Sequence, residues 1–107
     1  MAATIYKILS EGEWQAALKA GSFAGSQDDM RDGFIHLSTA EQVAGTAARH
    51  FAGRKDLLLL HVDVAKLPEG LKWEPSRGGQ LFPHLYAALP TSAVSRIERL
   101  TALHARP

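Results

Sequence analysis

The sequence predicts a small α+β domain in which two helices pack on a mostly antiparallel sheet that can be split into two parts. Three observations lead to this prediction. Strand-forming segments precede both helix-like segments, a helix-capping pattern follows each of these strands, and the second half of the chain holds only strand-like segments. The chain of 107 residues has no linker-like change in composition, so we expect residues 1–107 to form one domain.

The chain begins with a strand followed by a helix. Residues 5–9 are rich in strand formers. Ser10 and Glu13 then form a capping-box pattern, in which each side chain bonds to the backbone N–H of the other, so we expect a helix over residues 11–20. Residues 21–32 carry turn formers and little periodicity, which indicates a loop.

A second strand and helix follow. Residues 34–37 are a short apolar strand, and Thr39 with Gln42 repeats the capping-box pattern, so a helix is expected over residues 40–51. The unpaired backbone N–H groups of a helix start favour an anion, so this junction could hold a phosphate or carboxylate. The alternative is that Thr39 or its neighbour simply caps its own helix.

The second half of the chain is strand-like. Four strands are predicted there, over residues 57–64, 71–74, 81–89 and 94–100. The first is the most apolar run in the chain and is typical of a central strand. Pro83 lacks a backbone N–H and therefore indicates an edge, a bulge or a strand start. The last segment is also compatible with a short helix.

Composition and charge exclude several classes of function. Lys and Arg number 12 against 11 for Asp and Glu, and this balance gives no electrostatic footprint for nucleic acid or an anionic membrane. No apolar run approaches the roughly 20 residues of a membrane span, and there is no cysteine for disulfides or thiol catalysis. We expect a soluble, cytoplasmic protein with a small-molecule ligand. The sequence predicts no particular protein partner.

Two segments of the chain read almost alike. Residues 34–38 are Phe-Ile-His-Leu-Ser, and residues 82–86 are Phe-Pro-His-Leu-Tyr. In an extended backbone alternate side chains share a face, so each segment presents an aromatic ring, an imidazole and a hydroxyl together. Because an imidazole both donates and accepts hydrogen bonds near neutral pH, we expect His36 and His84 to face one concavity. The alternative is a chance similarity between two strand ends.

An acidic residue and a basic residue flank a glycine-containing turn. Glu74 follows Trp73 at a strand end, and desolvation by the indole would raise its pKa and suit it to acid–base chemistry. The alternative is a solvated Glu74. Arg77 could hold an anion or pair with Glu74.

Other motifs give little support for metal or nucleophile chemistry. The five histidines lack H-x-x-x-H spacing, so no metal site is predicted. His50 and His104 are expected to be exposed and outside any site, and His61 is expected to pair with Asp63. The chain has no G-x-S-x-G, G-x-G-x-x-G or G-x-x-x-x-G-K-[ST] motif.

Four short motifs resemble those of the DUF952 family of small bacterial proteins. They are Tyr-Lys-Ile at residues 6–8, Gly-Phe-Ile-His-Leu-Ser at 33–38, Trp-Glu at 73–74 and Phe-Pro-His-Leu-Tyr at 82–86. The resemblance runs from Ile5 to about Leu100. It implies a remote similarity to the ADP-ribosyltransferase superfamily, whose members bind NAD in a cleft between two small sheets without a dinucleotide-binding fingerprint.

The resemblance also implies roles for individual residues. His36-Leu37-Ser38 resembles the His-x-Ser or His-x-Thr pattern in which the imidazole holds the adenine-side ribose and the hydroxyl seats the nicotinamide ribose. Tyr86 or Phe82 would stack on nicotinamide. The catalytic glutamate of the superfamily matches only Glu98 in order along the chain. The 2′-phosphotransferase branch uses basic and histidine residues instead, which His84 resembles.

Together, these observations predict a cleft that binds a nucleotide-like ligand such as NAD or ADP-ribose, with transfer or cleavage at the ribose C1′. The sequence indicates no definite cofactor, and NAD is expected as a possible substrate. The candidate catalytic residues are His36, His84 and Glu74. The candidate ligand-binding residues are Ser38, Thr39, Arg77, Phe82 and Tyr86. The alternatives are a ligand-binding module without catalysis and an interaction protein.

Overall fold

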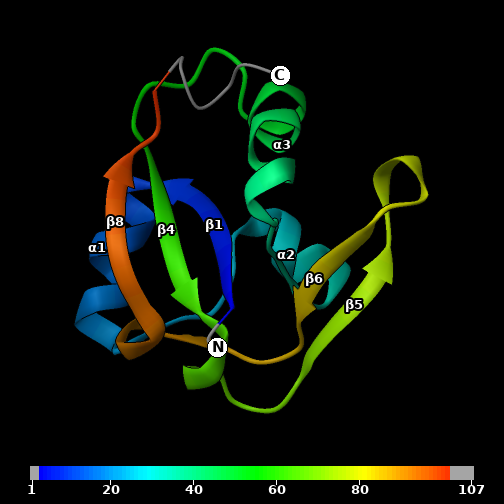
Figure 1. Cartoon of the computed structure of the whole chain (residues 1–107). Helices are drawn as coiled ribbons and strands as arrows, with labels where there is room; N and C mark the ends of the chain where they lie inside the picture. The colour runs from blue at the N-terminus through cyan, green and yellow to red at the C-terminus, as the bar shows by residue number, and fades with distance from the viewer. Residues whose placement is uncertain (1–2, 102–107) are drawn as a thin grey trace.

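The largest sheet has apolar side chains on both faces. Alternate residues of its central strand point to opposite faces, and those on each face pack into a separate buried cluster. In the computed structural model, which describes residues 3–101, this sheet has the antiparallel order β1–β4–β8 (Figure 1). Its strands are β1 (Thr4–Ser10), β4 (Leu57–Asp63) and β8 (Val94–Arg99). Leu58, Leu60 and Val62 of β4 face one buried cluster, and Leu57 and Leu59 face the other.

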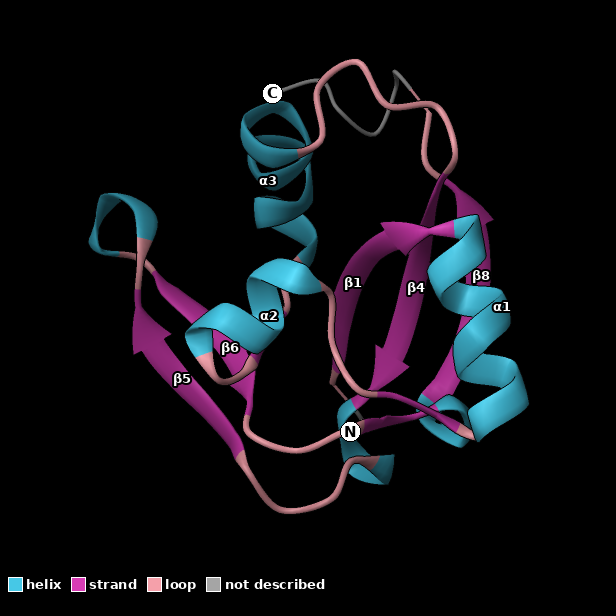
Figure 2. Cartoon of the chain, turned by 180° about the vertical axis from the view of Figure 1, so that it is seen from behind, coloured by secondary structure: helices cyan, strands magenta, loops and turns pink. Residues whose placement is uncertain are grey.

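Two helices cover the two faces of this sheet. Helix α1 (Glu11–Ala20) buries Trp14 and Ala17 in the larger cluster. Helix α3 (Val43–His50) buries Val43 and Ala47 in the smaller one. The reverse view shows α1 in front of the sheet and α2 (Gln27–Asp32) beside β6 (Figure 2).

The second three-stranded sheet has the antiparallel order β3–β6–β5. Its strands are β3 (Ile35–His36), β6 (Leu81–Leu85) and β5 (Leu71–Pro75). A pair of short strands, β2 (Ser22–Phe23) and β7 (Leu89–Pro90), forms a third sheet. In both views α3 and α2 lie between the two larger sheets (Figures 1 and 2).

The structure confirms the α+β class and the antiparallel sheets. The first capping box is present: the Ser10 backbone N–H donates to Glu13 Oε1 at 2.8 Å, and the Glu13 N–H donates to Ser10 Oγ at 3.0 Å. The final segment is a strand rather than a helix. The predicted second helix begins with a 3₁₀ turn, Ala40–Gln42, and ends at His50.

The expectation of a loop over residues 21–32 was wrong. This segment contains β2 and the additional helix α2, so the described residues form three α-helices rather than two. Helix α2 has its own capping box: Ser26 N–H donates to Asp29 Oδ2 at 2.8 Å, and Asp29 N–H donates to Ser26 Oγ at 3.3 Å. Asp29 replaces the usual Glu or Gln of this motif, and six residues are too few for a clear helical period.

The interpretation of Pro83 also needs correction. It lies in the middle of β6, the central strand of its sheet, opposite Trp73 of β5. This position is tolerated because β3 pairs only with His84 and Leu85, so no ladder bond from the Pro83 nitrogen is required on that side. The predicted strand over residues 81–89 is divided into β6 and β7.

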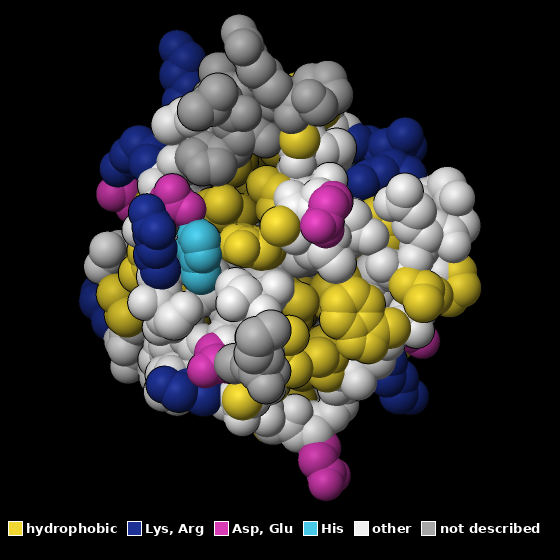
Figure 3. All heavy atoms as spheres, in the orientation of Figure 1, with side chains coloured by type: hydrophobic (Ala, Val, Ile, Leu, Met, Phe, Trp, Pro, Cys, Tyr) yellow, Lys and Arg dark blue, Asp and Glu magenta, His cyan; other side chains and the backbone are white. Residues whose placement is uncertain are grey.

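Apolar side chains gather on the surface over the β5–β6 hairpin (Figure 3). The large exposed ones on these two strands are Trp73 and Leu81. None of the helices within residues 3–101 is long and apolar enough to cross a membrane.

The connection from β4 to β5 requires glycine at position 70. Gly70 has a φ of +118°, and an added Cβ would lie 3.1 Å from the Tyr86 carbonyl oxygen. We predict that Gly70→Ala lowers the free energy of unfolding by about 1–3 kcal/mol, measured by urea denaturation. The control is Gly21→Ala, which also has a positive φ but nothing within 4 Å and should cost less. Equal losses in the two variants would contradict the steric argument.

Candidate ligand-binding site

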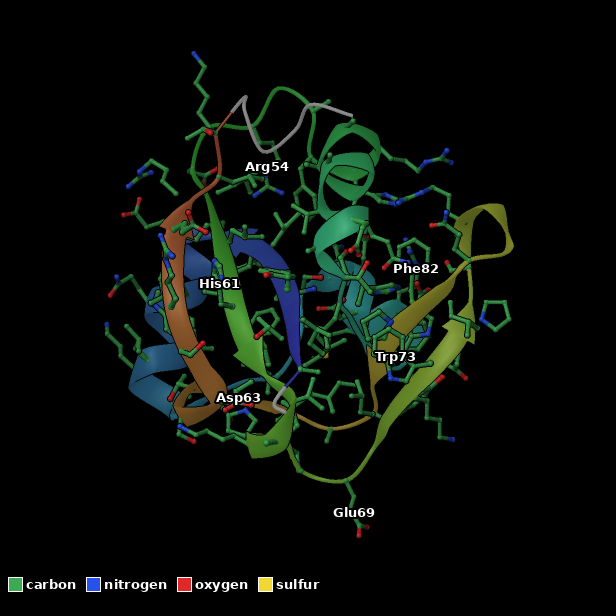
Figure 4. The ribbon with its side chains drawn as sticks, viewed as in Figure 1. Arg54, His61, Asp63, Glu69, Trp73 and Phe82 are labelled. Atoms are coloured by element: carbon green, nitrogen blue, oxygen red, sulfur yellow. The ribbon has the colours of Figure 1, made fainter. Side chains whose placement is uncertain are left out.

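A cavity of about 250 Å³ opens between the two larger sheets. Its walls come from β1, α2, β3, α3 and β6 and from the 3₁₀ turn η3 (Arg77–Gly79). Figure 4 shows Phe82 between α3 and the β5–β6 hairpin. The candidate residues that line the cavity are His36, Ser38, Arg77, Phe82 and His84. Thr39, Glu74 and Tyr86 lie outside its lining.

A buried ion pair forms one wall. Lys7 Nζ lies 3.0 Å from Asp29 Oδ2 and 3.2 Å from Oδ1, and the two side chains are only 5% and 2% exposed. Lys7 also donates to the His36 carbonyl oxygen at 3.0 Å. Asp29 accepts from the His36 backbone N–H at 3.1 Å, and its Oδ1 lies 2.6 Å from His36 Nδ1. The pair therefore joins β1, α2 and β3 at one point.

Burial has opposite consequences for the two partners. Desolvation alone would raise the pKa of Asp29, but hydrogen bonds from His36 and the charge of Lys7 outweigh it and hold that pKa well below its usual value. Desolvation lowers the pKa of Lys7, and the carboxylate of Asp29 opposes this effect. Each charge is thus compatible with burial only because the other is present.

Both ring nitrogens of His36 face carboxylates. Nδ1 contacts Asp29, and Nε2 lies 2.9 Å from Asp32 Oδ2. A neutral imidazole has one N–H, so only the imidazolium donates to both carboxylates at once. A hydrogen bond from Arg31 contributes most to the lowered pKa of Asp32. The His36 ring is therefore held at both nitrogens before any ligand arrives.

His84 has a different environment. Its ring centroid lies 5.8 Å from that of His36, and both rings line the cavity, as expected for two imidazoles facing one concavity. Phe34 stacks on the His84 ring at a centroid distance of 4.0 Å. His84 Nδ1 lies 2.8 Å from Glu74 Oε1, whereas Nε2 has no hydrogen-bond partner within residues 3–101.

Glu74 holds His84 from outside the cavity. Tyr86 donates its hydroxyl hydrogen to the same Glu74 oxygen at 2.7 Å. The hydrogen bonds from His84 and Tyr86 lower the pKa of Glu74, so the expected rise by desolvation was wrong. Trp73 is itself exposed and does not enclose the carboxylate. Glu74 pairs with His84 rather than with Arg77.

The backbone N–H groups that lead into the strand-to-helix junction are already bonded. The N–H groups of His36, Leu37, Ser38 and Thr39 donate to Asp29, Pro83, Tyr6 and Gln42, respectively. These four N–H groups are therefore not available to an anion, and an anion at this junction stays a prediction that concerns the first residues of the helix. Thr39 contributes its backbone N–H to a bond with the Gln42 side chain at 3.0 Å.

The hydroxyl of Ser38 points toward α3. Ser38 Oγ lies 3.2 Å from Thr46 Oγ1, and Arg77 Nη2 donates to the same Thr46 oxygen at 3.5 Å. The Arg77 guanidinium carbon lies 4.9 Å from the centre of the Phe82 ring. One face of Phe82 is therefore covered by Arg77, and Tyr86 likewise contacts Lys72 and Phe34.

Two other histidines have different surroundings. His50 is exposed as expected, and it also lines the cavity. His61 bonds to Glu98 of the neighbouring strand rather than to Asp63, which instead accepts from the Ala65 N–H. Figure 4 shows His61 on β4, in the other sheet from Phe82. His104 lies outside the described residues.

Among the residues that line the cavity and that sequence reasoning missed are Lys7, Asp29, Asp32 and Thr46. Lys7 carried a usable signal, because alternation places it on the same face as the apolar residues Ile5 and Leu9. A lysine at such a position requires a buried partner. Within residues 3–101, no group of three or more His, Cys, Asp or Glu side chains could hold a metal ion.

This geometry defines a small antiparallel α+β protein with a cavity between two sheets and two imidazoles in the cavity wall. The chain belongs to DUF952, a family of proteins of unknown function, whose family model matches residues 8–97. This match confirms the resemblance carried by the four short motifs. A comparison with functionally curated proteins gives no match.

Solved structures of a related protein have the same fold. The crystal structure of protein CC0527 from Caulobacter crescentus has a TM-score of 0.88 and 54% sequence identity, covering 92% of this chain and 86% of that chain. The solution NMR structure of CC0527 has a TM-score of 0.80 and 55% identity, covering 91% and 84%.

The buried pair of Lys7 and Asp29 makes the free energy of unfolding depend on pH in the acidic range. Because folding lowers the pKa of Asp29, its contribution is present above the unfolded pKa and is lost as pH falls toward the folded pKa. We predict that the free energy of unfolding of the wild type falls below about pH 4, and that Asp29→Asn shows a smaller fall. At pH 7 Asp29→Asn should cost about 3–5 kcal/mol, because Lys7 loses its counter-charge.

The control for this experiment is Asp28→Asn. Asp28 is adjacent to Asp29 but its side chain is 62% exposed, so its loss should change stability by less than about 0.5 kcal/mol. Urea denaturation at several pH values measures both variants. An Asp29→Asn variant as stable as Asp28→Asn at pH 7 would show that the buried pair does not hold the fold.

Proposed function

We propose that the cavity binds a nucleotide-like ligand, NAD or ADP-ribose. The observation that carries this proposal is the combination, in one cavity, of two imidazoles, a buried serine hydroxyl and an arginine. A ribose diol needs paired donors and acceptors, and a phosphate needs a cation. The position between two small sheets also agrees with the ADP-ribosyltransferase-like arrangement that the family resemblance implies.

The size of the cavity limits how much of the ligand it encloses. Its volume of about 250 Å³ is slightly below the roughly 300–1,000 Å³ of typical small-molecule pockets. It can therefore enclose one nucleotide-sized part, and the rest of a dinucleotide would lie along the open surface. The faces of Phe82 and Tyr86 are partly covered, so hydrogen bonding and charge contribute more to this proposal than ring stacking does.

His84 is the group best suited to accept a proton. When Nδ1–H donates to Glu74, the neutral ring leaves a lone pair on Nε2, the nitrogen without a protein partner. The side chain is only 6% exposed, and no buried side-chain nitrogen or oxygen among the described residues lacks a partner. Nε2 must therefore be reached from the cavity that His84 lines.

The reaction that fits this base is cleavage of NAD by water. A water oxygen would bond to the ribose C1′ as the C1′–N bond breaks, nicotinamide would leave with the bonding electron pair, and the water proton would pass to His84 Nε2. Glu74 would act as a positioning residue, since it fixes the ring from outside the cavity. The second candidate is a binding module without catalysis, which the position of Glu74 outside the cavity favours.

We predict that ADP-ribose binds and that His84→Ala weakens its binding roughly tenfold, as expected for the loss of a hydrogen bond between the ligand and Nε2. Isothermal titration calorimetry measures this, with His61→Ala as the control because His61 does not line the cavity. The absence of heat with millimolar ADP-ribose or NAD would contradict the proposal. Equal affinities in both variants would place the ligand elsewhere.

We predict that His84→Gln abolishes nicotinamide release from NAD, because the proton acceptor is lost. Glu74→Gln should slow release while leaving the Kd for NAD within about twofold, since Glu74 acts only through His84. Release is measured by chromatography over a range of pH. Binding without release in the wild type would favour the non-catalytic module, and unchanged release in His84→Gln would exclude His84 as the base.

A further inference from the structure

We propose that Arg77, together with Thr46 and His50, forms a phosphate subsite where α3 meets the turn after β5. This inference rests on the proposed function, because it assigns one group of the nucleotide to one end of the cavity. The subsite should also bind a phosphate-containing anion that has no nucleoside, such as pyrophosphate. All three residues line the cavity.

Among the described residues, no carboxylate pairs with Arg77 at this end of the cavity, although the charge of Asp28 acts on His50. Within the described part of the chain, neither Arg77 nor Arg49 forms an ion pair. Desolvation and the charge of Arg49 lower the pKa of Arg77. Desolvation, followed by the charge of Arg77, lowers the pKa of His50. The cations therefore repel one another, and a bound anion would relieve that repulsion.

The hydroxyl groups beside Arg77 leave a donor available. Thr46 Oγ1 accepts from Arg77 Nη2, and Ser38 Oγ lies 3.2 Å from the same oxygen. When Ser38 donates in this pair, Thr46 accepts two bonds and its own hydroxyl hydrogen remains free. A phosphate oxygen next to Arg77 could accept that hydrogen as well as those of the guanidinium.

Gly45 allows the guanidinium to reach this position. A Cβ at residue 45 would lie 3.0 Å from Arg77 Nη2, so even a methyl group there would require the guanidinium to shift by a few tenths of an ångström. Gly45 lies in helix α3, where glycine is less favourable than alanine. The residue that favours the helix less therefore lies at the position where the Arg77 guanidinium needs space. The ring of Phe82 also supports the guanidinium, whose carbon lies 4.9 Å from the ring centre.

The test compares ligands that differ by a phosphate. Calorimetry measures AMP, adenosine, ADP-ribose and pyrophosphate against the wild type, Arg77→Ala and Gly45→Ala. We expect the wild type to bind AMP at least tenfold more tightly than adenosine. Arg77→Ala should weaken the binding of AMP roughly 10- to 100-fold, as expected for the loss of a charge-assisted hydrogen bond. The affinity for adenosine should not change. Arg96→Ala is the control, since Arg96 is an exposed arginine on β8.

Gly45→Ala separates binding from folding. This variant should weaken the binding of AMP several-fold, because the guanidinium must move. It should also raise the Tm by roughly 2–8 °C, because alanine favours the helix. The control is Gly12→Ala in α1, where an added Cβ meets only Ser10 Oγ at 4.0 Å. That variant should keep wild-type affinity. A Gly45→Ala variant with wild-type affinity for AMP would contradict the positioning role of Gly45.

The outcomes distinguish the subsite from the proposed function. An unchanged AMP-to-adenosine ratio in Arg77→Ala would overturn the subsite, even if ADP-ribose still binds. Failure of the wild type to bind either AMP or pyrophosphate would also overturn it. Pyrophosphate binding that is lost in Arg77→Ala, without any binding of ADP-ribose or NAD, would support the subsite and reject the nucleotide function.

Discussion

The buried pair of Lys7 and Asp29 is the constraint on which the rest of the structure depends. Lys7 occupies a core-facing position of β1, where an uncompensated ammonium would be strongly destabilising. Asp29 supplies the counter-charge and also caps α2 through Ser26. A helix of six residues has little stability in isolation, so α2 depends on this tertiary contact. One carboxylate thus fixes a strand, a helix and the entry into β3.

The same contact places the site. Asp29 holds both the backbone and the ring of His36, and two residues later Ser38 exchanges backbone hydrogen bonds with Tyr6 of β1, each at 2.8 Å. These bonds anchor the start of the second sheet to the first. His36 lies directly opposite His84 in the β3–β6 ladder, so the register of a two-residue strand brings the imidazoles together. The cavity wall is therefore a consequence of strand pairing.

Local signals predicted the elements, but contacts between distant residues built the site. The capping box of α1 and the apolar run of β4 are each formed by residues close together in the sequence, and both were predicted from it. Asp29 lies 22 residues from Lys7, and no short motif links them. His61 was assigned its neighbour Asp63, whereas its partner Glu98 lies 37 residues away on β8. The two-histidine motif succeeded because alternation in short strands fixes which side chains share a face.

The distribution of hydrogen-bond partners indicates which groups can select a ligand. Asp29 and Asp32 are already paired with Lys7, Arg31 and His36, so a ligand that contacts them must replace existing bonds and gains little. Among the described residues, His84 Nε2 has no hydrogen-bond partner and Arg77 has no ion-pair partner beyond its bond to Thr46, so a ligand that contacts these groups adds interactions and displaces few. These two groups are the reason why the ligand we propose is anionic at one end and brings a hydrogen-bond donor to the imidazole of His84.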